Sequence, residues 1–267
     1  MKRRPSRGLR VAYGWLQAFG LDPRLLGRAV RGIPQAVREY TDLRRQNSRL
    51  PGPWEISFSS PNLHDRFAES GATRGHYFIQ DLFVAQKIRT ANPSRHVDVG
   101  SRIDGFVAHV ASFRPIEVLD IRPLDLQFEN ISFRQCDITL GTNGLDEYAD
   151  SVSCLHALEH IGLGRYGDRP DINGHLRALE TLTAILKRQG TLYLSVPIGQ
   201  ERIEFNGHRV FAVATVLGMT QRAFDLVEFS YIDDSGILHE RADAYGREAR
   251  GDFDLRYGCG IFQLRRR

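Results

Sequence analysis

The sequence has few cysteines and no long apolar run. Only Cys136, Cys154 and Cys259 occur in 267 residues, and no two of them form a C-x-x-C pair. This predicts neither a disulfide framework nor a cysteine-built zinc site, and it indicates a reducing compartment. No apolar run approaches the roughly 20 residues needed to span a bilayer. Because no apolar segment with a small-residue cleavage site follows the opening MKRRPSRG, we expect no secretory signal and a cytoplasmic protein.

Basic residues are concentrated at the start of the chain. Residues 1–50 contain 12 Lys or Arg and 3 Asp or Glu, which gives a net charge of +9. The rest of the chain contains 24 Lys or Arg and 29 Asp or Glu, which gives −5. We expect this arm to form helices broken at Pro23 and Pro34, followed by a linker over 51–75. The arm could be a solvated or packing face, a dimer contact, or a peripheral contact with the anionic inner face of a membrane. Nucleic acid is disfavoured, because no RNA-binding motif accompanies the charge and the body is acidic.

From residue 76 onward, short apolar strands alternate with amphipathic helices. The helices are expected over 78–90, 106–113, 176–188 and 210–217. The strands are expected over 96–100, 116–121, 131–137, 151–155, 192–196, 224–232 and 260–264. This alternation predicts one α/β domain over 76–267, a seven-stranded, mostly parallel sheet with helices on both faces. No clear helix separates the last two strands, so one of them could run antiparallel.

Acidic residues follow three successive predicted strands. Asp98-Val-Gly100-Ser101-Arg-Ile-Asp-Gly105 comes after the first strand and opens a helix, the second strand ends in Asp120, and the third ends in Asp137. Glycine lets the backbone approach a ligand closely. A carboxylate after the second strand can accept hydrogen bonds from both hydroxyls of a ribose. Asp137 could accept a hydrogen bond from the amino group of adenine. Each aspartate could instead serve as an ordinary turn residue. Taken together, they predict a nucleoside site at the carboxyl edge of the sheet.

The glycine loop fits a dinucleotide poorly. Arg102 replaces the middle glycine of G-x-G-x-x-G, and Asp104 stands beside the final glycine. Extra carboxylates repel a pyrophosphate but suit a ligand with an amine and a sulfonium. S-adenosylmethionine therefore matches the acidic residues better than NAD does.

At these residues the chain resembles the class I S-adenosylmethionine-dependent methyltransferases, over roughly residues 76–265, with a Rossmann-like fold. The resemblance implies that the D-x-G-x-x-x-G loop and the two later acids bind the cofactor, although the usual middle glycine is missing. We assign to this site Asp98, Gly100, Ser101, Gly105, Asp120, Ile121, Asp137, Ile138 and Leu155. Tyr77 precedes the first helix of the domain and could stack on the cofactor as a lid, or be a core aromatic.

Longer phrases resemble an uncharacterised, methyltransferase-like bacterial family, a domain of unknown function that often accompanies polysaccharide-assembly genes. They are HVDVGSRIDGFVAH, LHALEHIGLGRYGD, LYLSVPIG, EFNGHRVF and RYGCGIFQL. The resemblance implies O-methylation of a sugar or glycan-biosynthetic acceptor. A non-catalytic, cofactor-binding scaffold protein of a glycan-assembly complex is the alternative, and an NAD-dependent oxidoreductase ranks below both.

The fourth predicted strand leads into His156-Ala-Leu-Glu159-His160. Transfer to a hydroxyl needs a base, so His156 or His160 is the predicted base and Glu159 would orient one of them. His160 and Glu159 could instead have only a structural role and tie the next loop to the sheet. The same letters spell the H-x-x-E-H zinc-peptidase pattern. Gly162, which follows at once with further glycines, would break the helix that this pattern requires.

Four further residues are candidate contacts to the acceptor. Arg165 and Asp168 lie in the glycine-rich segment GLGRYGD, which reads as a loop over the carboxyl edge or as a plain surface loop. Asp168 could also join His156 around a divalent ion. His208 and Arg209 follow Asn206 at the expected start of the 210–217 helix, where Asn206 could act as a cap. No metal ligand set is assigned.

Overall fold

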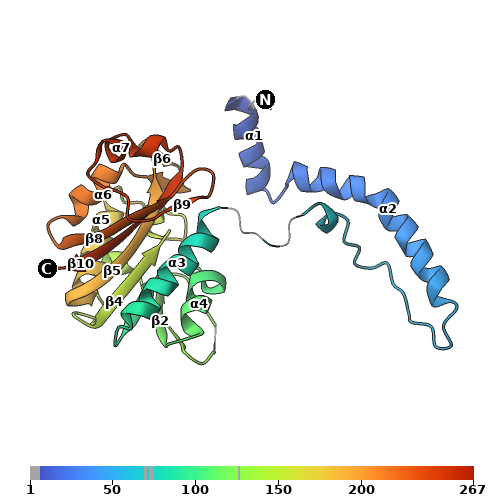
Figure 1. The fold of residues 1–267 in the computed structure, drawn as a ribbon, viewed down its shortest axis with the longest axis horizontal. Coiled ribbons are helices and arrows are strands. Elements are labelled where there is room, and N and C mark those ends of the chain that lie inside the picture. The colour runs from blue at the N-terminus through green and yellow to red at the C-terminus, as the bar shows by residue number, and fades with distance from the viewer. Residues whose placement is uncertain (1–6, 69–70, 72–74, 126) are drawn as a thin grey trace. The chain divides into compact units, whose positions relative to one another are not determined.

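The chain forms two compact units, 1–72 and 73–267, each described here by itself (Figure 1). The computed structural model describes residues 7–68, 71, 75–125 and 127–267. The first six residues of the basic arm lie outside that set. Within it, no helix is long and apolar enough to cross a membrane.

The first unit is built on two helices, α1 (Arg7–Ala18) and α2 (Pro23–Asn47). Asp22 caps α2, its Oδ1 accepting the backbone N–H groups of Arg24 and Leu25 at 2.8 and 3.3 Å. The predicted break at Pro34 is wrong, because α2 continues through it. Proline removes only one backbone donor, and the turns on both sides keep theirs.

One face of α2 carries a stripe of exposed apolar side chains. Leu26, Val30, Ile33 and Val37 follow the spacing of a helical face and are all exposed. Arginines accompany the stripe along the helix. Whether this helix contacts a membrane surface, packs on the rest of the chain or forms a dimer contact stays a prediction.

The second unit is organised around one eight-stranded sheet, with strand order β3-β2-β1-β4-β5-β10-β8-β9. Its strands are β1 (His96–Val99), β2 (Ile116–Asp120), β3 (Ile131–Gln135), β4 (Ala149–Leu155), β5 (Leu186–Ile198), β8 (Phe224–Ile232), β9 (Leu238–His239) and β10 (Gly258–Arg266). Strands β1 to β5 pair in parallel, and β10 runs antiparallel to both β5 and β8. The predicted α/β class and mostly parallel sheet are therefore confirmed, and β10 is the antiparallel strand; the short edge strand β9 was not predicted.

Helices cover both faces of this sheet (Figure 1). They are α3 (His76–Ala91), α4 (Ala108–Ala111) preceded by a π-helical turn (Ile103–Val107), α5 (Gly174–Ile185), α6 (Val213–Thr220) and α7 (Arg247–Arg250). One apolar core packs α3 and α4 against the sheet, and the other packs α5, α6 and α7. Successive residues of a strand point to opposite faces of the sheet and so enter different cores. In β2, Val118 belongs to the core under α3 and α4, and Leu119 belongs to the other core.

Two predicted helix boundaries are wrong. The helix expected to end at Arg188 ends at Ile185, and β5 begins at Leu186 without a connecting loop. The residues from Asn206 to Arg209 do not open a helix. They belong to a small hairpin of β6 (Arg202–Glu204) and β7 (His208–Val210), which pair antiparallel. Pairing with a partner strand prevails here over local helix signals.

Candidate functional site

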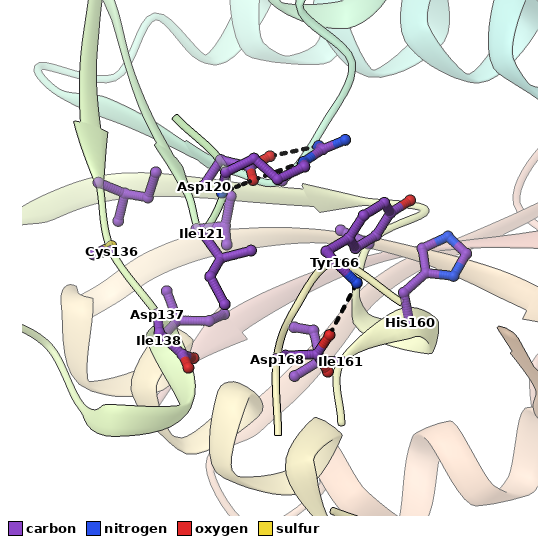
Figure 2. A pocket seen from close by; sticks show the side chains of 14 residues that line it. Asp120, Ile121, Cys136, Asp137, Ile138, His160, Ile161, Tyr166 and Asp168 are labelled. Carbon is purple, nitrogen blue, oxygen red and sulfur yellow. Dashed lines mark hydrogen bonds and ion pairs between the residues drawn. The ribbon is translucent and has the colours of Figure 1, made fainter. Parts of the chain in front are cut away.

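A cavity opens where β1 to β4 end. Its walls are the backbone and side chains of Val99, Gly100, Leu119, Asp120, Ile121, Arg122, Cys136, Asp137, Ile138, Ala157, His160, Ile161, Tyr166 and Asp168 (Figure 2). The site lies beside the point at which the strand order reverses: β2 and β3 lie on one side of β1, and β4 and β5 lie on the other. Ligands of open α/β sheets bind at such a point.

Gly100 forms the floor of the cavity directly after β1. Its φ of +72° lies in the left-handed region, and a Cβ built there would stand 2.9 Å from the Cβ of Ala157. A side chain at this position would therefore be strained and would close the gap between the β1 and β4 loops.

Asp120 ends β2 on the cavity wall and is bound by Arg122. The Arg122 guanidinium donates to both carboxylate oxygens, at 3.0 and 2.6 Å, and lies 4.4 Å above the ring of Tyr166. Arg122 thus links the end of β2 to the loop that follows β4. A ligand hydroxyl that binds Asp120 must share the carboxylate with Arg122 or displace it.

Asp137 follows β3 and caps a short helical turn. Its Oδ1 accepts the backbone N–H and the hydroxyl of Thr139 at 2.8 and 2.7 Å. The remaining carboxylate oxygen has no such bond among the described residues. Asp137 and Ile138 therefore reach the cavity wall from a turn whose geometry the aspartate itself fixes.

Asp98 does not line the cavity, contrary to the idea of three carboxylates around one ligand. It is fully buried beneath the loop and accepts the Ser101 N–H at 3.0 Å, the Ser101 hydroxyl at 2.6 Å and the Ser153 hydroxyl at 2.5 Å. Burial raises its pKa to about 6 despite these donors. Its structural role is to tie the Gly100 loop to β4.

The buried carboxyl of Asp98 predicts a pH-dependent stability difference. Its folded-state pKa of about 6 exceeds the ordinary 3.8, so the folded chain holds this proton more tightly than the unfolded chain does. The resulting stability is fully present below about pH 4 and is lost as pH rises through 6. Relative to Asp98→Asn, the wild-type free energy of unfolding should fall by about 2–3 kcal/mol between pH 4 and 7. Urea unfolding of both proteins measures it, and a difference independent of pH would contradict this account.

The structure separates the two candidate bases. His160 lies on the cavity wall, and its Nδ1 donates to the Gly207 carbonyl at 2.5 Å. This bond leaves Nε2 without a proton in the neutral ring. Burial lowers the pKa of His160 below its ordinary 6.5, so the neutral form prevails near pH 7.

His156 and Glu159 form a buried pair behind that wall. The His156 Nδ1 lies 2.8 Å from a Glu159 carboxylate oxygen, and neither residue lines the cavity. Burial opposes a charge on His156, but the nearby Cys259 sulfur and Glu159 carboxylate outweigh it and raise the pKa of the imidazole. Glu159 also lies 3.7 Å from the His160 Nε2, so it faces both histidines.

Three of the four predicted acceptor contacts do not line the cavity. Arg209 is buried and donates to the backbone carbonyls of Ile161 and Ile172 at 2.7 and 3.1 Å, which fixes the loop after β4. His208 packs against Tyr257, and Arg165 donates to the Gly207 carbonyl at 2.9 Å.

Asp168 does line the cavity, but its carboxylate is used locally. It accepts the backbone N–H groups of Gly162 and Gly164 at 2.7 and 3.1 Å. It also accepts that of Tyr166 at 3.1 Å (Figure 2). Asp168 therefore holds the glycine loop in shape, and the idea that it joins His156 around a metal ion finds no support in these contacts.

Besides Asp98, four predicted cofactor residues lie outside the cavity wall. Tyr77 is partly exposed at the start of α3 with its ring 5.1 Å from that of His156, and Ser101 is buried on Asp98. Gly105 packs against α3, because a Cβ there would stand 2.5 Å from an Asp81 carboxylate oxygen. Leu155 belongs to the core under α3 and α4.

Sequence reasoning missed Arg122 and Tyr166 as wall residues. Arg122 follows the predicted acid by two positions, and Tyr166 sits inside the predicted loop. The cation–π contact between them could not be anticipated, because it joins segments that are distant in sequence.

Comparisons with known proteins agree with this fold without assigning an activity. A family model described as a Caenorhabditis protein of unknown function, DUF268, matches residues 117–242, a little under half of the chain. No curated protein matches the chain significantly.

Similar solved structures are distant in sequence. The [4+2]-cyclase SpnF has a TM-score of 0.52 and 14% identity, over 73% of this chain and 85% of SpnF. The N-methyltransferase NodS of Bradyrhizobium japonicum WM9, in complex with S-adenosyl-L-homocysteine, has a TM-score of 0.49 and 16% identity, over 85% and 97%. A 1,6-didemethyltoxoflavin-N1-methyltransferase of Burkholderia thailandensis, with bound 1,6-didemethyltoxoflavin and S-adenosylhomocysteine, has a TM-score of 0.49 and 14% identity, over 70% and 78%.

The strand order and directions are those of the Rossmann-like class I methyltransferase fold predicted from the sequence. At such identities the likeness to SpnF shows a shared fold alone, and one fold can host different reactions.

Proposed function

We propose that the chain binds S-adenosylmethionine in this cavity and transfers its methyl group to an acceptor. The observation that carries the proposal is the placement of Asp120, Asp137 and Ile138 on one cavity wall at the ends of adjacent strands. Asp120 would accept the two ribose hydroxyls, and Asp137 with Ile138 would contact the adenine. Gly100 would leave room for the middle of the molecule beside the loop after β1.

The charges on the wall favour this ligand over a dinucleotide. Of the described residues, Arg122 is the only Arg or Lys on the cavity wall, and Asp120 neutralises it. Arg102, on the loop beside the site, is paired with Asp104 at 2.8 Å. Among the described residues of the wall and of this loop, a pyrophosphate would therefore meet no free Arg or Lys.

Titration calorimetry tests the proposal. The full chain should bind S-adenosylmethionine and S-adenosylhomocysteine, and it should not bind NAD⁺ measurably at the same concentrations. Binding of NAD⁺ alone would replace the proposal with an oxidoreductase, and binding of none of the three would end it.

An oxygen acceptor is proposed because a histidine base lies on the wall. When bound, S-adenosylmethionine supplies an electrophilic methyl group with a thioether as its leaving group. The acceptor oxygen would form the new bond to that carbon while the His160 Nε2 takes the hydroxyl proton. The wall would hold the acceptor in place beside the methyl group. A sugar or glycan-biosynthetic acceptor rests on the sequence resemblance to the polysaccharide-associated family.

A cofactor-binding protein without transfer activity is the second candidate. It is favoured by the local bond from His160 to Gly207, which a purely structural histidine would also make. Release of S-adenosylhomocysteine with free and nucleotide-linked sugars as acceptors separates the candidates: binding without any turnover over the whole panel selects the second.

A further inference from the structure

Two histidines and a cysteine from three distant elements meet behind the cavity wall. His76 is the first residue of α3, His156 follows β4 directly, and Cys259 is the second residue of β10. One nitrogen of each ring and the Cys259 sulfur all lie within 4.8 Å of one another. His156 and Cys259 are buried and His76 is partly buried.

The buried pair of His156 and Glu159 leaves two polar atoms without a hydrogen-bond partner among the described residues, His156 Nε2 and Glu159 Oε2. The Nδ1 of His156 is paired with Glu159, but its buried Nε2 has no such partner. Buried nitrogen atoms without a hydrogen-bond partner are rare, so each one requires an explanation. The backbone of His156 also adopts a φ of +49°, uncommon for a residue with a Cβ, so the chain pays a conformational cost to place this ring.

The surroundings match those of a metal-binding histidine. Such a histidine offers one nitrogen to the ion and holds its other nitrogen against a carboxylate, which fixes the tautomer and the ring. Glu159 occupies that second place at 2.8 Å and is fully buried. Packing alone accounts for the stacked rings of His76 and His156, 5.6 Å apart, but it gives no partner to Nε2.

We propose that His76, His156 and Cys259 bind one zinc ion. Imidazole nitrogens and a thiolate are the ligands that zinc prefers, whereas magnesium and calcium need oxygen atoms. Tetrahedral zinc brings such donors to about 3.3–3.6 Å from one another, so these side chains must close by roughly 1 Å. The Cys259 thiol, now 3.3 Å from the Gln80 side-chain oxygen, would lose its proton to the solvent as the Zn–S bond forms.

Three protein ligands leave the fourth zinc position open to water or another small ligand. None of the three residues lines the cavity, so the zinc site does not depend on the proposed cofactor. Its link to the cavity is Glu159, which also faces the His160 Nε2 at 3.7 Å.

Metal analysis of the full chain tests this site. After dialysis against zinc and removal of the unbound ion, the wild type should retain one zinc per chain. His156→Ala and Cys259→Ser should retain almost none. Glu159→Gln keeps all three ligands and should weaken zinc binding by roughly 10–100-fold. His239→Ala and Cys136→Ser, which remove the same groups elsewhere, should keep full occupancy.

Cobalt(II) bound to the wild type provides a readout that does not depend on whether any variant folds. Bound to the wild type it should give a sulfur-to-cobalt charge-transfer band, which Cys259→Ser removes and Cys136→Ser keeps. Absence of that band in the wild type, less than stoichiometric zinc after loading, or unchanged zinc in folded His156→Ala would each overturn the proposal.

Discussion

Replacing His160 with Gln should lower kcat for methyl transfer by about 10²–10⁴-fold, the contribution typical of a positioned base. Glutamine can still donate to the Gly207 carbonyl, so the loop that His160 holds should keep its shape. The dissociation constant for S-adenosylhomocysteine should stay unchanged, because the proposed cofactor contacts lie on Asp120 and Asp137. Turnover and calorimetry on the same preparations separate these two effects.

A pH profile distinguishes a base from a structural histidine at this position. The base acts when neutral, and burial puts the pKa of His160 below 6.5. The wild-type kcat should therefore rise with pH, with the midpoint of the rise below pH 6.5, and His160→Gln should lack this rise. His175→Gln is the matched control: His175 is half-buried at the start of α5, away from the cavity, and its loss should leave kcat unchanged. Equal losses in the two variants would remove His160 from the mechanism.

Replacing Asp120 with Ala should weaken binding of S-adenosylhomocysteine by roughly 10–150-fold, equivalent to about 1.5–3 kcal/mol for hydrogen bonds to a charged group. The ribose hydroxyls would lose their acceptor at the end of β2. Titration calorimetry at constant salt measures the change.

Arg122→Ala separates a ligand-binding Asp120 from one that only pairs with Arg122. The Arg122 side chain is 49% exposed, and exposed ion pairs contribute about 0–1 kcal/mol. Arg122→Ala should therefore change the dissociation constant by less than about 5-fold and leave Asp120 free for the ribose. If both variants lose the same affinity, the carboxylate acts through Arg122 and not on the ligand.

The cavity residues divide into those that local patterns reveal and those that only contacts reveal. Asp120 and Asp137 stand where apolar strands end, so their position at one edge follows from a parallel sheet. Asp98 carries the same signal, yet its carboxylate turns inward to Ser101 and Ser153. Sequence spacing cannot give that direction, because it depends on which donors the neighbouring strand presents.

The same limit applies to Arg209 and Cys259. Arg209 looked like a substrate contact on an expected helix, but a hairpin turns it onto the carbonyls of Ile161 and Ile172. Cys259 is 103 positions after His156, and no sequence motif links the two residues. Antiparallel pairing of β10 with β5 places it at the edge where His156 emerges from β4.

The amino-acid sequence alone determined the α/β class, the parallel strands and the edge at which polar residues gather, because hydrophobic periodicity and strand ends are local properties of the chain. Tertiary structure decided which polar side chains face the cavity and which are buried beneath it. It separated His160 from His156 and brought His76 to Cys259, since burial and hydrogen-bond partners come from segments that meet only when the sheet is assembled.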